Sequence, residues 1–390
     1  MGAHPFERLD LVIMPTCFAS LGFASPSVSF LSESLLCGDG SMCCRLAHEI
    51  THSWFGFSIG AADWNEEWQS EGFATYMEDH IQALARQWSV DEKSQQLDLH
   101  ARLRYNILKS DLANTDDNLQ TLKPSKHIDD DEHIDCIQDG LNPEKWLTQI
   151  HHIKGYFLLR YLSKLVGEEI FFQVLQTYIK NFHGNLVPSK KFFDTLFNIC
   201  PFLHDEGFTI DAIYKDWLDF PGMPFILQNQ LPWKQDNPLI NEVYTEVEKW
   251  KCRDKALRRK RKRKRAKVGH LKTTQLSPAQ LVLFLDTLLE LNVISTHTLK
   301  ELDAIYGFCH QNAEIQHRWC ELIVKFQFLQ KYDDIKSFLI NHQSMGVYLY
   351  GELTLSGNTH QRQLAEECFS RVKDDMDQVC YKAVWNMIYG

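Results

Sequence analysis

The most constraining feature of the sequence is an H-E-x-x-H motif that runs from His48 to His52 and is followed, after eighteen residues, by Glu71. On a helix, histidines at positions i and i+4 share one face, so both imidazoles can bind one zinc ion. Glu71 can supply a third protein ligand, which leaves the fourth position open for water, as in catalytic zinc sites. Glu49 lies beside the first ligand and is the expected general base. The motif predicts one Zn2+ per chain and hydrolytic chemistry.

The segments around these residues are compatible with helices. Residues 47–55 carry apolar side chains at helical spacing, and residues 71–78 form a second helix-compatible stretch. The third ligand is therefore expected on a second helix that packs against the first. The alternative interpretation is an amphipathic helix pair whose histidines and glutamates bind no metal.

Two stretches carry a family resemblance: HEITHSWFG at 48–56 and WQSEGFATY at 68–76. They resemble the gluzincin zinc aminopeptidases, in particular the branch of leukotriene hydrolase and aminopeptidase B. The resemblance implies a peptide substrate, zinc ligands at His48, His52 and Glu71, and a proton transfer from the zinc-bound water to Glu49. It also implies that Glu78 contacts one of the zinc ligands without binding the metal and so holds that ligand in place. The alternative is that Glu78 is an ordinary helix-surface glutamate.

The chain departs from the family pattern at three places. Ala24 stands where the family has a glutamate that binds the substrate's amino group, and a methyl group cannot bind an ammonium. His152 stands where the family has a tyrosine that donates to the oxyanion. An imidazole N–H can make that donation, and the alternative is an ordinary helix-face histidine. Residues 343–346 lack the arginine and lysine that bind a peptide carboxylate in the relatives.

The expected substrate preference comes from acidic residues. Glu144 matches a family position that favours a basic first residue, and further acids lie at 129–139 in the neighbouring polar loop. A solvated loop is the alternative interpretation of that acidic run. We expect a preference for Arg or Lys at the N-terminus of the substrate.

The hydrophobic pattern predicts a mainly α fold. Strands are expected at 9–14 and 27–36, and helices at 42–56, 66–89, 91–111, 145–164, 167–181, 189–199, 209–218 and 240–268, with further helices to the end of the chain. The resemblance implies a partial thermolysin-like catalytic domain followed by an armadillo-like α-solenoid.

The predicted domains are a catalytic domain at 1–220, a linker at 221–274 that carries a basic signal, and a helical C-terminal domain at 275–390. Family members carry a β-rich domain before the catalytic one. We therefore expect an N-terminally incomplete form, in which the catalytic sheet is reduced to one or two strands with exposed apolar faces.

Composition excludes several classes of protein. The net charge of −10 argues against nucleic-acid binding by the body of the protein. No run reaches 18 apolar residues, so no membrane span or membrane partner is expected. The 11 scattered cysteines are typical of reduced intracellular thiols.

One basic run stands out from this acidic chain. It contains eight consecutive cations: Arg258, Arg259, Lys260, Arg261, Lys262, Arg263, Lys264 and Arg265. Such runs indicate binding to the nuclear import machinery, with a weak, salt-sensitive contact to RNA phosphates as a second use. Together with the resemblance, the run predicts a nuclear and nucleolar location, with the cytoplasm as a second one. The alternative is a solvated helix.

Three functions remain open at the level of sequence. The first is a zinc aminopeptidase with Glu49 and His152 as catalytic residues. The second is a catalytically impaired zinc-binding scaffold, as Ala24 and His152 suggest. The third is a nucleolar interaction module that uses the helical domain and the basic run. Zinc content and Glu49-dependent hydrolysis separate them.

Overall fold

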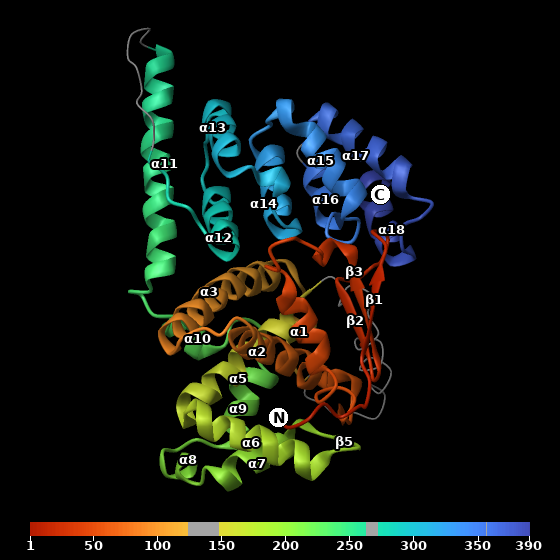
Figure 1. Cartoon of the computed structure of the whole chain (residues 1–390), viewed down its shortest axis with the longest axis vertical. Coiled ribbons are helices and arrows are strands. Elements are labelled where there is room, and N and C mark those ends of the chain that lie inside the picture. The colour runs from red at the N-terminus through yellow and green to blue at the C-terminus, as the bar shows by residue number, and fades with distance from the viewer. Residues whose placement is uncertain (124–147, 263–271, 356) are drawn as a thin grey trace. The chain divides into compact units, whose positions relative to one another are not determined.

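The computed structural model describes residues 1–123, 148–262, 272–355 and 357–390 (Figure 1). Glu144, the acids at 129–139 and the end of the basic run from Arg263 to Arg265 lie outside these residues. The backbone of residues 259–262 is described as helix. The predictions that concern these side chains therefore stay predictions.

The chain divides into two compact units. Unit 1 comprises residues 1–12, 23–29 and 44–235, and unit 2 comprises residues 13–22, 30–43 and 236–390. Both consist mostly of helices, which confirms the predicted mainly α fold. The domain boundaries predicted near 220 and 274 stay predictions.

A three-stranded sheet forms near the start of the chain. It consists of β1 (Asp10–Met14), β2 (Gly22–Ser25) and β3 (Val28–Ser32) in the order β1-β3-β2. The sequence predicted one long strand over 27–36, but β3 ends where the Ser32 side chain accepts a hydrogen bond from Ser34 N and starts a 3-10 turn. The sheet has three strands where one or two were expected, and β2 was not predicted. Apolar side chains of the sheet are exposed, including Leu11 at 49% and Phe23 at 55%.

Unit 1 contains the helices around the motif. They are α1 (Cys43–Thr51), α2 (Trp68–Ala85), α3 (Val90–Asn114), α5 (Ile150–Val166), α6 (Glu168–Phe182), α7 (Ser189–Ile199), α8 (Phe202–Asp205), α9 (Ile210–Ile213) and α10 (Phe225–Asn229). Two short strands, β4 (Ile59–Ala61) and β5 (Asn185–Val187), pair in parallel. These two strands were not predicted.

Several of the predicted helices in unit 1 are shorter than expected, including the one predicted over 66–89, which is α2 (Trp68–Ala85). The helix predicted over 42–56 ends at Thr51. Some of the backbone hydrogen bonds that follow span three residues instead of the four of an α-helix, as where Trp54 N donates to Thr51 O at 3.0 Å. The helix predicted over 209–218 is the single turn of α9 followed by a π-helical turn at Tyr214–Leu218. His52 therefore lies just beyond α1, in a turn.

The α2 and α5 helices cross at unusually short range, and glycine makes this contact feasible. A Cβ added to Gly72 would lie 2.9 Å from Gly155 Cα, and one added to Gly155 would lie 2.8 Å from Gly72 Cα. No larger side chain fits at either position without moving backbone. The large side chains Trp68, Phe73, Tyr156 and Phe157 of these helices are buried around the crossing.

Unit 2 contains eight helices in its described part. They are α11 (Pro238–Lys262), α12 (Pro278–Leu289), α13 (Thr296–Tyr306), α14 (Ala313–Lys325), α15 (Tyr332–Asn341), α16 (Val347–Leu355), α17 (Thr359–Val372) and α18 (Gln378–Tyr389). Alternate helices pack on one another, α12 on α14, α14 on α16 and α16 on α18 (Figure 1). This stacking is the arrangement of the predicted α-solenoid.

The α11 helix covers much of the segment predicted as a linker. Its Trp250 is buried and donates to the hydroxyl of Tyr306 on α13 at 3.4 Å, and Arg253 forms an ion pair with Glu301 at 2.8 Å. The helix thus packs on the first helices of unit 2. None of the helices in the described part of the chain combines the length and apolar composition that a bilayer span requires.

Candidate metal centre

Three histidine rings surround one carboxylate oxygen in unit 1. The oxygen is Oε2 of Glu71, on the first turn of α2. It lies 3.2 Å from His48 Nε2, 3.5 Å from His52 Nε2 and 2.9 Å from His152 Nε2. His48 and His52 come from α1 and the turn after it, and His152 comes from the first turn of α5. Ligand atoms of His48, Glu71 and His152 all lie within 4.8 Å of one another.

The second ring nitrogen of each motif histidine has a polar neighbour. His48 Nδ1 lies 3.3 Å from Oε2 of Glu78, and His52 Nδ1 lies 3.1 Å from the carbonyl oxygen of Phe55, to which it can donate. Such partners fix a ring so that its other nitrogen faces the metal. Glu78 thus lies beside the second nitrogen of the His48 ring, and its predicted support of a metal ligand stays a prediction.

Glu78 belongs to a buried charged network on α2 and α3. Arg104 forms ion pairs with Glu78 and with Asp79, whose Oδ2 lies 2.6 Å from the guanidinium, and His100 Nδ1 lies 2.7 Å from Asp79 Oδ1. Burial raises the pKa of Glu78, but the Arg104 charge and the contact with His48 outweigh burial and lower that pKa to about 2. Glu78 therefore stays ionised behind the site.

Negative charge dominates around His48. Burial lowers the pKa of this imidazole, but hydrogen bonds and charges from Glu71 and Glu78 outweigh burial and raise it to about 10. The pKa of Glu71 is held well below its usual value, because His152 and His52 outweigh the effect of burial. The pocket thus favours a cation among these side chains, either a proton or a metal ion.

The predicted base also lies in this region. Glu49 follows His48 on α1, and its side chain is buried. Burial raises the pKa of Glu49, while the neighbouring His48 and His52 act in the opposite direction. The structure therefore places a carboxylate of raised pKa on the helix that carries the first histidine of the motif.

The donor set fits zinc. With zinc–nitrogen distances of about 2.0–2.1 Å, the ligand atoms of a tetrahedral site lie about 3.3 Å apart. The three distances from Glu71 Oε2 to the imidazole nitrogens bracket this value. Imidazole and carboxylate are also the ligand types of catalytic zinc sites. His48, Glu71 and His152 have ligand atoms close enough to one another to hold the ion. His52 lies outside this set, although its Nε2 is 3.5 Å from Glu71 Oε2.

Sequence reasoning missed the residues that bring α2 and α5 together. Gly72 and Gly155 set the close crossing that places Glu71 opposite His152. A glycine inside a helical pattern is the available signal, since such a residue often marks a close contact. Arg104 and Asp79 were missed as well, and no local pattern in the sequence marks them.

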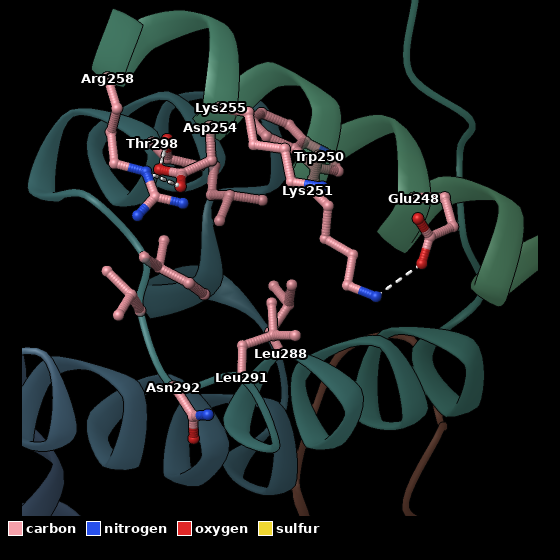
Figure 2. Close-up of a pocket in the computed structure, with 13 residues that line it drawn as sticks. Glu248, Trp250, Lys251, Asp254, Lys255, Arg258, Leu288, Leu291, Asn292 and Thr298 are labelled. Carbon is pink, nitrogen blue, oxygen red and sulfur yellow. Dashed lines mark hydrogen bonds and ion pairs between the residues drawn. The ribbon is translucent and has the colours of Figure 1, made fainter.

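A separate hollow of about 180 Å³ lies in unit 2, against α11 (Figure 2). Its walls combine apolar residues such as Leu288 and Leu291 with the charged side chains of α11. Two of the cations are paired with carboxylates of the same helix. Lys251 pairs with Glu248 at 2.6 Å, and Arg258 pairs with Asp254 at 2.7 Å. Arg258, the first cation of the basic run, is therefore already paired.

Comparison with known proteins finds a matching family domain for each of two long segments of the chain. The sequence profile of the Peptidase family M1 domain matches residues 2–217, and that of the Leukotriene A4 hydrolase C-terminal domain matches residues 276–388. Aminopeptidase O of Mus musculus is 43% identical over 397 residues, which cover 100% of this chain and 48% of the relative. Aminopeptidase B of Rattus norvegicus is 27% identical over 383 residues, or 95% of this chain and 54% of the relative.

The chain thus spans about half the length of these curated relatives. Among solved structures, yeast LTA4 hydrolase in complex with bestatin superposes with a TM-score of 0.79 at 21% identity. This match covers 98% of the present chain and 59% of the hydrolase. At that identity, the match establishes the shared fold.

Proposed function

The chain belongs to peptidase family M1, and from this premise we propose that it is a zinc-dependent aminopeptidase that removes N-terminal residues from peptides. One observation carries the proposal: the rings of His48 and His52 converge on the Glu71 carboxylate. A buried Glu49 stands on the same helix as His48. This is the set of residues that the motif requires for hydrolysis.

Each residue has a distinct task in the proposed reaction. His48, His52 and Glu71 hold the zinc ion. When bound, zinc polarises the scissile carbonyl and increases the acidity of water. Glu49 accepts the proton of the attacking water and returns it to the leaving amine. Glu78 holds the His48 ring in place through Nδ1, to which its Oε2 lies at 3.3 Å.

His152 is the proposed donor to the oxyanion that forms on the substrate. It projects from the first turn of α5 toward Glu71, with Nε2 2.9 Å from Oε2. Loss of one such donor costs roughly two to three orders of magnitude in kcat. The assignment predicts that His152→Phe lowers kcat more than it changes KM.

Preference for an N-terminal Arg or Lys is the second part of the proposal. It is supported by Glu144 and by the acids at 129–139 in the sequence. Arg-, Leu- and Glu-aminoacyl reporters, assayed with wild type and Glu144→Gln, test it. We expect Arg to be the best substrate and the variant to lose that advantage; equal rates on Arg and Leu would contradict the preference.

Zinc content discriminates this function from its two rivals. One zinc per chain together with Glu49-dependent hydrolysis supports the aminopeptidase. Zinc without hydrolysis supports a zinc-binding scaffold, which the methyl group of Ala24 at the amine-binding position favours. Absence of zinc supports an interaction module. The matched variant Glu71→Ala, which removes one ligand, is expected to lose the metal.

We also propose that the basic run 258–265 directs the protein to the nucleus and nucleolus through the nuclear import machinery, with the cytoplasm as a second location. Eight adjacent cations in the sequence support this, and the backbone of residues 258–262 among them belongs to the last turns of α11. A contact with RNA phosphates is a further, salt-sensitive use. Neutral replacement of the eight residues is expected to abolish nuclear accumulation of a tagged protein, and unchanged localisation would contradict the proposal.

A further inference from the structure

We propose that His152 is a fourth protein ligand of the zinc ion in the resting protein, and that it is the ligand that leaves when substrate binds. This inference rests on the proposed zinc site. It goes beyond that site because it closes the coordination position that the H-E-x-x-H motif alone leaves open.

The distances allow ligation. His152 Nε2 lies 2.9 Å from Glu71 Oε2, in the same range as the nitrogens of His48 at 3.2 Å and His52 at 3.5 Å. The His152 ring also stacks on that of His48, with centroids 5.8 Å apart and planes 16° apart. His152 thus offers its nitrogen to the same point in space as the motif residues do.

The backbone holds His152 in this position. It lies on the first turn of α5, three residues before Gly155, and Gly155 packs directly on Gly72, the residue after Glu71. The crossing of α2 and α5 therefore sets the separation between the Glu71 carboxylate and the His152 imidazole. A ligand pair fixed by helix packing needs little reorganisation to bind a metal.

The surroundings of the second ring nitrogen differ among the three histidines. Nδ1 of His52 lies 3.1 Å from the carbonyl oxygen of Phe55, whereas the Nδ1 atoms of His48 and His152 are both buried without a hydrogen-bond partner among the described residues. His48 Nδ1 still has the Glu78 carboxylate within ion-pair distance, at 3.3 Å, and His152 Nδ1 has neither kind of partner in the described part of the chain. Because such partners strengthen a histidine ligand, His152 is the weakest-held of the three.

Exposure points to the same residue. The His152 side chain is 31% exposed, compared with 7% for His48 and 11% for His52. Solvent, and therefore a substrate, reaches the site on the His152 side. With His152 bound, the site is closed and holds its metal firmly. Its release frees the coordination position that hydrolysis needs and makes the imidazole available to the substrate.

The test measures metal binding, separately from activity. The metal-free chain is titrated with zinc against a competing chelator for wild type, His152→Gln and the control His183→Gln. Glutamine keeps an N–H donor at position 152 but is a poor zinc ligand. His183 is an exposed histidine at the end of α6 in the same unit. Far-UV circular dichroism checks that all three are folded.

We expect His152→Gln to weaken zinc binding by at least about tenfold, since loss of even an outer partner of a ligand costs roughly 10–100-fold. We expect the control to match wild type. In the cobalt-loaded proteins, the visible absorption bands should shift in His152→Gln alone. Wild-type zinc affinity and an unchanged cobalt spectrum in His152→Gln would overturn the inference.

A measurement on the wild type avoids any dependence on variant folding. X-ray absorption at the zinc edge counts imidazole ligands, and the inference expects three. A count of two would overturn it while leaving the proposed function intact. Failure of the wild type to bind zinc would instead overturn the proposed function together with this inference, so the two failures are distinguishable.

Discussion

The helices of the metal centre and those of unit 2 are fixed by different means. In unit 2, side chains at the N-caps of α12, α13, α14, α17 and α18 accept hydrogen bonds from the first turn; they are Ser277, Ser295, Asn312, Asn358 and Asp377. In unit 1, α2 and α5 begin at Glu67 and Gln149 with no side-chain cap bond. Their positions depend on the glycine crossing and on buried charges. Local signals define the solenoid helices, whereas tertiary contacts define the site.

The largest expected effect tests the buried charges behind the site. Arg104→Leu removes the guanidinium that Glu78 and Asp79 share in the interior and leaves them only their histidine contacts, which should lower the free energy of unfolding by about 3–5 kcal/mol. The matched change in unit 2 is Arg253→Leu, whose partner Glu301 is partly exposed. That change should cost about 1 kcal/mol or less. Urea denaturation followed by circular dichroism measures both, and equal losses would contradict the contrast.

Glycine substitutions give the next largest effect. Gly155→Ala places a methyl group 2.8 Å from Gly72 Cα, so the helices must separate at a cost of about 1–3 kcal/mol. Zinc affinity should fall as well, because Glu71 and His152 move apart.

The control for this prediction lies in α16 of unit 2. A Cβ on Gly351 would meet Met387 Sδ at 3.5 Å, an ordinary contact. Gly351→Ala should therefore stabilise the protein by up to about 1 kcal/mol through helix propensity. Thermal unfolding measures both variants. Destabilisation by Gly351→Ala equal to that of Gly155→Ala would show that the crossing is not special.

The same contrast explains what could be predicted from the sequence. Ser277 and Pro278 at the start of α12 form a pattern that is visible in the sequence, because an N-cap signal acts within one turn. His48, His52 and Glu71 were identifiable because their spacing is itself the chemical requirement. The partners in the glycine crossing and the position of Arg104 could not be predicted, because they depend on residues that meet only after α2, α3 and α5 have packed. A glycine within a helical pattern signals a close contact but does not say with which helix. For the same reason, the contact between His152 and Glu71 became visible only in the structure.

The smallest effect concerns helix starts. Ser277→Ala removes a cap whose hydroxyl accepts from Gln280 N, and it should cost about 1 kcal/mol. Gln149→Ala at the start of α5 removes a side chain that makes no cap bond, so its effect should be close to zero. A comparable loss from both variants in thermal unfolding would mean that α5 depends on its cap as much as α12 does.

The central claim is that the residues of α1 and α2 form a working hydrolytic zinc site. Its most direct test compares hydrolysis of an Arg-aminoacyl reporter by zinc-loaded wild type and Glu49→Gln. Glutamine keeps the shape of the residue but cannot accept a proton, so kcat/KM should fall by about 10²–10⁴ with the zinc content unchanged. Equal rates for the two proteins, including no hydrolysis by either, would contradict the claim.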